Sequence, residues 1–318
     1  MKKLTLLGSL AVILIASAAS EVSAQETLKL AVGQRTLWDT SVSEIGQRAG
    51  IFKKHGLDLE ILYTQGAGET QQAVIAGSVE VGVGVGVMGV LGAYSKGAPI
   101  RVIGAEVNGA GDLFWYVKAD SPIRSLKDLG PGNTLAYSTN GSSTHGIVTA
   151  FIKQYDLKAK PIATGGPPAT LTQVMSDQVD VGWSAPPVGL DLIDQGRIRI
   201  LATGNDTLFK DQTVRLLLTS VSALKSRKSA IDNYIKAYRE TVDTMYSDPA
   251  ALKLYAQFAG IPEATGKRIR DQFFPKEAIE PDNIKGMDVI VKDAVALKFT
   301  ASELTRAELA DLFRIPPR

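Results

Sequence analysis

Short apolar runs alternate with amphipathic stretches along the first two thirds of the chain. The apolar runs have the length of strands, and the stretches between them carry apolar side chains at the three- and four-residue spacing of helices. The expected strands are residues 27–32, 57–62, 80–84, 100–107, 113–118, 134–138, 179–183, 198–203 and 215–220. The expected helices between them are residues 41–50, 69–76, 87–94, 142–155, 171–176 and 188–195. This alternation predicts an α/β fold of βαβ units, with a largely parallel sheet and helices on both faces.

From about Ser229 onward, helical spacing continues almost to the end of the chain. The expected helices there are residues 229–246, 249–259, 263–272, 282–296 and 303–312. Helices that end such a chain often pack back on its first domain. We therefore expect a discontinuous first lobe, residues 25–110 plus 215–318, and a second lobe, residues 111–214, inserted into it. Two chain crossings between the lobes would form a hinge, with a cleft beside it.

The first 24 residues have the pattern of a secretory signal peptide. Lys2 and Lys3 precede an apolar run over residues 4–15, and Val22-Ser23-Ala24 fits the small-x-small cleavage rule. The apolar run is short for a membrane anchor and lacks a following positive flank. We therefore expect export to the periplasm and cleavage after Ala24.

Composition excludes several classes of function. The chain has 318 residues, which suggests two domains, and 35 Lys+Arg against 33 Asp+Glu leave a formal charge of only +2. A nucleic-acid partner is not expected at this balance. The absence of cysteine excludes thiol nucleophiles, cysteine zinc sites, iron–sulfur clusters and disulfides. The only histidines, His55 and His145, are not spaced as a metal pair. We therefore expect neither a metal nor a cofactor.

The richest candidate binding segment is Ser138-Thr-Asn-Gly-Ser-Ser-Thr-His145, which runs from a strand end into a helix N-terminus. Free backbone N–H groups and the helix dipole favour a bound anion at such a place. Simple N-capping needs only one of these residues, so the excess of hydroxyl groups indicates ligand contact. The candidate contacts here are Ser138, Asn140, Gly141, Ser142 and Ser143.

Further candidates follow other predicted strands, because loops at the carboxyl ends of strands line the binding crevice of open α/β sheets. They are Gln34, Arg35, Trp38, Gln65, Gly66, Trp183 and Ser184. Arg35 would pair with an anionic group, and Trp38, Tyr63 or Trp183 would cover an apolar part of the ligand. An exposed Arg35 and a Trp38 packed in the core are equally compatible with the sequence.

Two enzymatic alternatives stay open. Gly84-x-Gly86-x-x-Gly89 follows a strand and opens a helix, and Glu106 ends the next strand, as in the dinucleotide-binding fingerprint of an oxidoreductase. The surrounding Gly-Val repeat, the short helix and the lack of free cofactor outside the cytoplasm weigh against this. The second alternative is a one-substrate enzyme with His145 as acid or base.

Five segments, in this order, resemble the periplasmic substrate-binding proteins of ABC importers. They are residues 49–59 (AGIFKKHGLDL), 71–82 (QQAVIAGSVEVG), 97–102 (GAPIRV), 120–129 (DSPIRSLKDL) and 179–182 (VDVG). The most similar group includes the aliphatic-sulfonate, taurine and nitrate binders and the thiamine-precursor-like proteins.

The resemblance implies a two-lobed type II periplasmic binding protein fold, with a mixed, mostly parallel sheet flanked by helices in each lobe and a ligand cleft between them. It implies a non-enzymatic, monomeric protein that captures a small organic anion, sulfonate-like or carboxylate-like. Because enzyme relatives share this fold, it leaves open an enzyme of pyrimidine or thiamine-precursor chemistry on the binding-protein fold. The protein would deliver this solute to an ABC transporter permease that has a separate cytoplasmic ATPase. In this group the start of the helix after the Gly-rich turn faces the ligand, which adds Val87 and Met88 to the candidate contacts.

Overall fold

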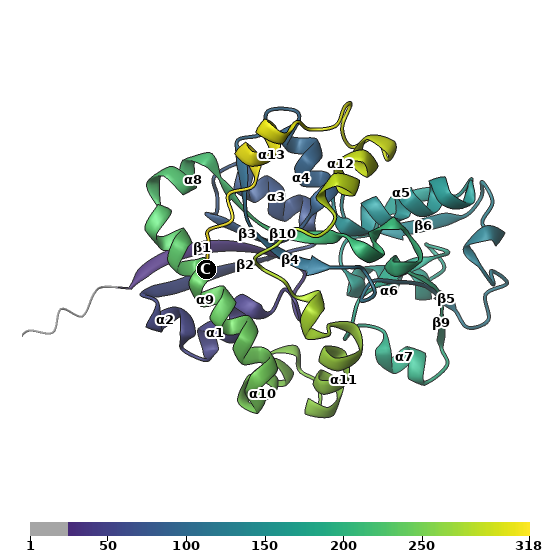
Figure 1. The fold of residues 1–318 in the computed structure, drawn as a ribbon. Helices are drawn as coiled ribbons and strands as arrows, with labels where there is room; N and C mark the ends of the chain where they lie inside the picture. The colour runs from purple at the N-terminus through teal and green to yellow at the C-terminus, as the bar shows by residue number, and fades with distance from the viewer. Residues whose placement is uncertain (1–24) are drawn as a thin grey trace, which may run out of the picture.

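Three β-sheets, of five, three and two strands, are flanked by helices and form two lobes in a computed structural model that describes residues 25–318 (Figure 1). The predicted signal peptide, residues 1–24, lies outside the described residues. We call the five-stranded sheet that holds the N-terminal strand, together with its helices, the first lobe. The other sheets with their helices are the second lobe.

The first lobe is built on a sheet with the strand order β2-β1-β3-β10-β4. Its strands are β1 (Glu26–Gly33), β2 (Leu57–Thr64), β3 (Val81–Gly86), β4 (Ile100–Asn108) and β10 (Thr213–Ser220). Strand β1 pairs in parallel with β2 and β3, and β10 pairs antiparallel with β3 and β4. Four strands therefore run one way and β10, which comes from the far end of the chain, runs against them.

The second lobe repeats this arrangement. Strands β5 (Phe114–Lys118), β8 (Gly182–Ser184) and β9 (Ile198–Thr203) pair antiparallel in the order β8-β5-β9, and β6 (Thr134–Tyr137) pairs in parallel with β7 (Lys160–Ala163). The N–H of Ala136 donates to the carbonyl of Val181 at 2.9 Å, which joins β6 to the residues just before β8. The strands thus follow the order β7-β6-β8-β5-β9, with β5 as the single reversed strand. The expected mixed, mostly parallel sheets are confirmed.

Helices cover both sheets, and their bounds follow local capping signals. Ser142 accepts the N–H of His145 at the start of α5, and Asp248 accepts that of Ala250 at the start of α10. The helices are α1 (Val42–Arg48), α2 (Ile51–Lys54), α3 (Ala67–Ile75), α4 (Val87–Tyr94), α5 (Ser143–Tyr155), α6 (Pro167–Met175), α7 (Leu190–Asp194), α8 (Val221–Ser226), α9 (Lys228–Ser247), α10 (Pro249–Ala259), α11 (Glu263–Phe273), α12 (Met287–Ala296) and α13 (Arg306–Leu312). Within residues 25–318, none of the helices has the length and apolar content needed to cross a membrane.

The chain crosses between the lobes twice, after β4 and before β10, and the two crossings lie against each other. The N–H of Ala110 donates to Asn205 Oδ1 at 2.9 Å, and the N–H of Gly204 donates to the carbonyl of Leu113 at 2.8 Å. After β10 the remaining helices stay with the first lobe, and the N–H of Arg314 donates to the carbonyl of Val102 beside β4. Placing the lobe boundaries at residues 110/111 and 214/215 remains a prediction.

Candidate functional site

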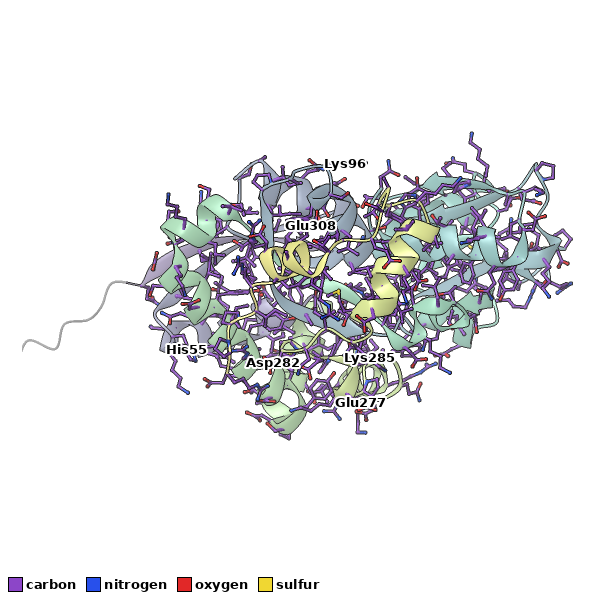
Figure 2. All side chains as sticks on the ribbon, turned by 45° about the horizontal axis from the view of Figure 1, so that its top comes forward. His55, Lys96, Glu277, Asp282, Lys285 and Glu308 are labelled. Carbon is purple, nitrogen blue, oxygen red and sulfur yellow. The ribbon has the colours of Figure 1, made fainter. Side chains whose placement is uncertain are left out.

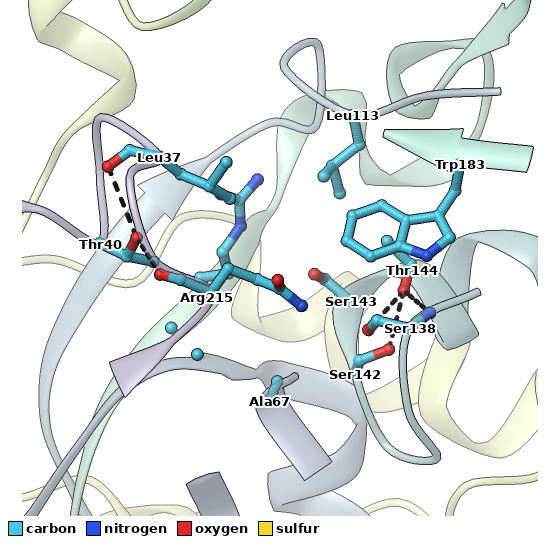
Figure 3. Close-up of a pocket in the computed structure, with 13 residues that line it drawn as sticks. Leu37, Thr40, Ala67, Leu113, Ser138, Ser142, Ser143, Thr144, Trp183 and Arg215 are labelled. Atoms are coloured by element: carbon cyan, nitrogen blue, oxygen red, sulfur yellow. Dashed lines mark hydrogen bonds between the residues drawn. The ribbon is translucent and has the colours of Figure 1, made fainter. Parts of the chain in front are cut away.

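A pocket with about 340 Å³ of empty space lies where the two lobes meet (Figure 3). The first lobe contributes Gly33, Gln34, Leu37, Thr40, Ala67, Gly84 and Arg215 to its lining. The second lobe contributes Leu113, Ser138, Ser142, Ser143, Thr144 and Trp183. This figure includes space open to solvent, and the enclosed part is only about 30 Å³, so the pocket as described here is narrow.

Hydroxyl groups at the N-terminus of α5 form one wall of the pocket. Thr144 Oγ1 accepts the N–H of Ser138 at 2.9 Å and is hydrogen-bonded to the hydroxyls of Ser138 and Ser142 at 3.0 and 2.9 Å (Figure 3). These bonds hold the three hydroxyls in place. Within residues 25–318, the backbone N–H groups of Ser143 and Thr144 and the Ser143 hydroxyl have no partner. They are donors left over for a ligand.

The N-terminus of α3 also reaches the pocket, because its first residue, Ala67, lines it. The N–H of Gly68 donates to Thr139 Oγ1 in the second lobe at 2.9 Å, which brings the starts of α3 and α5 together. A helix N-terminus carries about half a positive charge, and two that converge on one small pocket favour an anion there.

Arg215 lines the pocket from β10, yet its charge is used inside the protein. Its Nη1 donates to Asp39, and its Nη2 lies 2.6 Å from both carboxylate oxygens of Asp112. All three side chains are buried. Burial disfavours the charge of Arg215, but the two carboxylates outweigh it and raise its pKa. Burial raises the pKa of Asp112 to about 6, although Arg215 opposes that rise.

Glu106 lies next to this ion-pair cluster. Its Oε2 accepts the N–H of Gly84 at 2.7 Å, and its side chain is fully buried. Burial, together with the nearby Asp39 carboxylate, raises the pKa of Glu106 well above its usual value.

Apolar side chains form the remainder of the lining. Leu113 lies beside the Trp183 ring, the hydroxyl wall lies on the other side of that ring, and the first lobe contributes Leu37 and Ala67 (Figure 3). The Trp183 indole N–H donates to the carbonyl of Gly165 at 3.2 Å, which fixes the orientation of the ring. The pocket thus combines a polar end with an apolar wall.

Five of the residues singled out from the sequence line this pocket: Gln34, Ser138, Ser142, Ser143 and Trp183. Gln34 adopts a left-handed backbone conformation (φ 74°), which is unusual for a residue with a long side chain. Its Nε2 donates to the carbonyl of Gln65 at 2.6 Å, and its own carbonyl accepts the hydroxyl of Thr40 at 2.8 Å. These contacts hold the backbone of Gln34, which forms part of the pocket wall, in a conformation that would be unfavourable without them.

Arg35 and Trp38 lie elsewhere. The Arg35 guanidinium is exposed and lies over the rings of Phe258 and Tyr63, 4.8 and 5.6 Å from their centroids. Trp38 is fully buried, its indole N–H donates to the Tyr246 hydroxyl at 2.9 Å, and its ring contacts Tyr255 edge-on. The structure thus matches the alternative of an exposed arginine and a tryptophan packed in the core.

The other candidates surround the pocket without lining it. Gly66 and Gln65 lie at the contact between the lobes, because a Cβ atom at Gly66 would lie 2.6 Å from Thr139 Oγ1. Val87 and Met88 are buried at the start of α4, and Ser184 is buried and donates to the carbonyl of Val188. Asn140 and Gly141 line a separate outer groove.

Sequence reasoning missed Gly33, Leu37, Thr40, Ala67, Leu113, Thr144 and Arg215 as lining residues. Arg215 had one usable signal, which is a single charge within the apolar strand TVRLLLTS. Such a charge is rarely buried unless it is paired. Thr144 belongs to the serine-rich segment that was recognised. The apolar residues carry no signal that separates a lining residue from a core residue.

The Gly-rich turn has a structural reason that involves no dinucleotide. A Cβ atom at Gly89 would lie 2.1 Å from the carbonyl oxygen of Gly141, and one at Gly86 would lie 2.5 Å from the backbone nitrogen of Ser143. Both glycines therefore permit α4 to approach the start of α5 closely. Glu106, which the fingerprint would place on a ribose, instead accepts the N–H of Gly84 in the interior.

Neither histidine reaches the pocket. His55 lies on the side of the first lobe away from the second lobe and contacts Glu240 at 2.8 Å (Figure 2). His145 lines the outer groove, accepts the N–H of Gly141 on Nδ1 at 3.1 Å and stacks on Tyr137. Residues 25–318 contain no cluster of three or more acidic or histidine side chains arranged to hold a metal ion.

We expect His145 to be neutral at pH 7, because burial lowers its pKa below the ordinary value of 6.5. Its imidazole should take up a proton only at more acidic pH, and that protonation should cost stability since the unfolded chain binds the proton more readily. A ¹H–¹³C NMR titration of the imidazole signals measures this. The variant His55→Gln leaves a single histidine and assigns the signal. A midpoint at or above 6.5 would contradict the buried environment.

Comparison with solved structures shows the class of fold. The alkanesulfonate-binding protein SsuA from Xanthomonas axonopodis pv. citri, bound to MOPS, is similar with a TM-score of 0.74 and 17% identity, covering 91% of this chain and 98% of that one. The periplasmic aliphatic sulphonate binding protein SsuA from Escherichia coli is similar with a TM-score of 0.69 and 18% identity, covering 92% and 93%. The periplasmic nitrate-binding protein NrtA from Synechocystis PCC 6803 gives 0.71 and 14%, covering 92% and 86%. The fold is thus that of the periplasmic binding proteins.

The family follows from the sequence itself. Residues 45–252, more than half of the chain, match the family described as NMT1/THI5 like, and the protein belongs to that family. No match is found among curated protein sequences. The resemblance stated from the five segments is thereby confirmed.

Proposed function

We propose that this protein is an extracytoplasmic solute-binding protein that captures a small organic anion and delivers it to the permease of an ABC importer. The observation that carries the proposal is the pocket at the N-terminus of α5, where the N–H groups of Ser143 and Thr144 are left without partners among the described residues. The anionic head of a sulfonate or carboxylate satisfies these donors, and Trp183 and Leu113 cover its organic part.

The likeness to sulfonate- and nitrate-binding proteins supports this proposal. In the same proposal, the signal peptide is cleaved after Ala24, the mature protein works as a monomer in the periplasm, and a separate cytoplasmic ATPase powers transport. In this proposal no bond is made or broken in the pocket, and His145, the acid or base of the enzymatic alternative, lines the outer groove.

Thermal unfolding of residues 25–318 against a ligand panel tests the proposal. The panel holds alkyl sulfonates, taurine, nitrate, aromatic carboxylates, aminopyrimidines and nicotinamide dinucleotides. A ligand at 100 times its Kd adds about 2.7 kcal/mol, a rise of about 2–4 °C in Tm. A rise with a small organic anion supports the proposal, whereas a rise with a dinucleotide alone would overturn it.

A matched pair of variants on α5 tests whether the ligand contacts the start of this helix. Ser143→Ala removes a hydroxyl that faces the pocket, and a hydrogen bond to a charged group contributes about 1.5–3 kcal/mol, so affinity should fall about tenfold or more. Thr149→Ala removes a hydroxyl that bonds only to the carbonyl of His145 within the helix, and it should leave affinity unchanged. Equal effects of the two changes would argue against ligand contact at the start of α5.

A further inference from the structure

Among the residues that line the pocket, Arg215 alone carries a full charge, and that charge is already balanced. Asp39 holds Nη1 and Asp112 holds Nη2. The side chains of Arg215, Asp39 and Asp112 are 4%, 0% and 2% exposed, so water does not screen these interactions. The two carboxylates thus neutralise the charge of Arg215, and among the described residues only its Nε is left without a hydrogen-bond partner.

The charge balance at the floor of the pocket is in fact negative. One guanidinium faces two buried carboxylates, so negative groups outnumber positive ones in this cluster. Positive potential also reaches the pocket from the starts of α3 and α5, each worth about half a charge. These two partial charges balance a single anionic head.

We propose that Asp39 and Asp112 limit the charge of the ligand: by neutralising Arg215 they disfavour every anion to some degree and a doubly charged one most, so that the pocket takes one negative charge and excludes a second. The inference rests on the proposed function and names its substrate class, which is a monoanion with an organic body. A second negative charge would be buried against the negative cluster with no counter-charge, and burying an unpaired charge is strongly unfavourable. A free arginine would instead have offered a bidentate bond to a dianion such as sulfate.

The test compares two ions with the same tetrahedral head. Methanesulfonate carries one charge, and sulfate replaces its methyl group by a second anionic oxygen. Isothermal titration of residues 25–318 at pH 7.5 and constant ionic strength should give at least tenfold tighter binding of methanesulfonate. The variants Asp112→Asn and Asp39→Asn each remove one negative charge while keeping the side-chain shape.

The expected change follows a simple rule. Coulomb energy is proportional to the charge of the ligand, so the gain in free energy for sulfate is twice that for methanesulfonate. A threefold gain in affinity for methanesulfonate should therefore accompany about a ninefold gain for sulfate. The matched control is Glu106→Gln, which changes a neighbouring buried carboxyl whose pKa is raised by burial, and it should change the ratio of the two affinities less than either aspartate variant does.

The outcomes separate the two proposals. Equal affinity for both ions in the unaltered protein, or an unchanged ratio in both folded aspartate variants, overturns the role of Asp39 and Asp112 while leaving anion capture in place. If only one aspartate variant folds, its ratio decides. Failure of every variant and of the unaltered protein to bind either ion or any other anion overturns the proposed function itself.

Discussion

Replacing Arg215 by methionine should destabilise the protein by about 3–5 kcal/mol, the cost of leaving buried carboxylates without their partner. Asp39 and Asp112 both depend on this one guanidinium, and neither is reached by solvent. Urea unfolding of residues 25–318, followed by tryptophan fluorescence, measures the loss as a lower transition midpoint. The control is Lys228→Met, which breaks an exposed ion pair with Asp232 and should change stability by less than about 0.5 kcal/mol.

The same cluster offers a rescue. Adding Asp39→Asn and Asp112→Asn to Arg215→Met removes the unpaired charges and should recover part of the lost stability. A loss below about 1 kcal/mol for Arg215→Met alone would mean that water reaches the cluster in solution. Failure of the triple variant to recover any stability would mean that packing of the arginine stem, and not its charge, dominates.

A methyl group at Gly89 should weaken ligand binding by about 10- to 100-fold. In Gly89→Ala the new Cβ atom would lie 2.1 Å from the backbone oxygen of Gly141 in the other lobe, so the lobes cannot approach as closely as they do here. Overpacking of this kind costs about 1–3 kcal/mol, and it destabilises the closed conformation, in which the two lobes are in contact. Titration with methanesulfonate measures the effect.

Gly132→Ala is the control, because a Cβ atom at Gly132 meets nothing within 4 Å. Gly89→Ala should also give a larger radius of gyration than the unaltered protein in small-angle scattering at saturating ligand. Unchanged affinity together with unchanged dimensions would show that the start of α5 yields locally and that close contact between the lobes is not needed.

The alternation of apolar and polar positions predicts most of the fold, because strands and helices that face a core must keep their period. Helices α4 and α10 begin and end where the pattern places them. Strand β7 was missed because Lys160–Ala163 is only four residues long, largely exposed and contains a proline, so it lacks the pattern of a buried strand. Helices α2 and α8 are too short for their period to be recognised.

The residues of the functional site also divide into those that local sequence reveals and those that only the fold brings together. The serines at the start of α5 were found because capping and anion binding use local sequence. Arg215 was missed because its partners Asp39 and Asp112 lie 176 and 103 residues away, and only the fold brings them together. Trp38 was predicted to contact the ligand because the local sequence does not show that Tyr246 and Tyr255, from the C-terminal helices, bury it.

Strand β10 in the middle of the first sheet has a consequence for how a newly made chain folds. Strand β3 gains its second neighbour only when Gly86 pairs with Arg215 of β10. Closing the long loop of chain between these two residues is slow. All strands of the second lobe, in contrast, lie between Phe114 and Thr203, so that lobe can be completed without waiting for the rest. Arg215 arrives with β10, and until then Asp39 and Asp112 have no counter-charge. The chain thus joins its two halves and balances its buried charges in the same late step, and the pocket exists only once that step is complete.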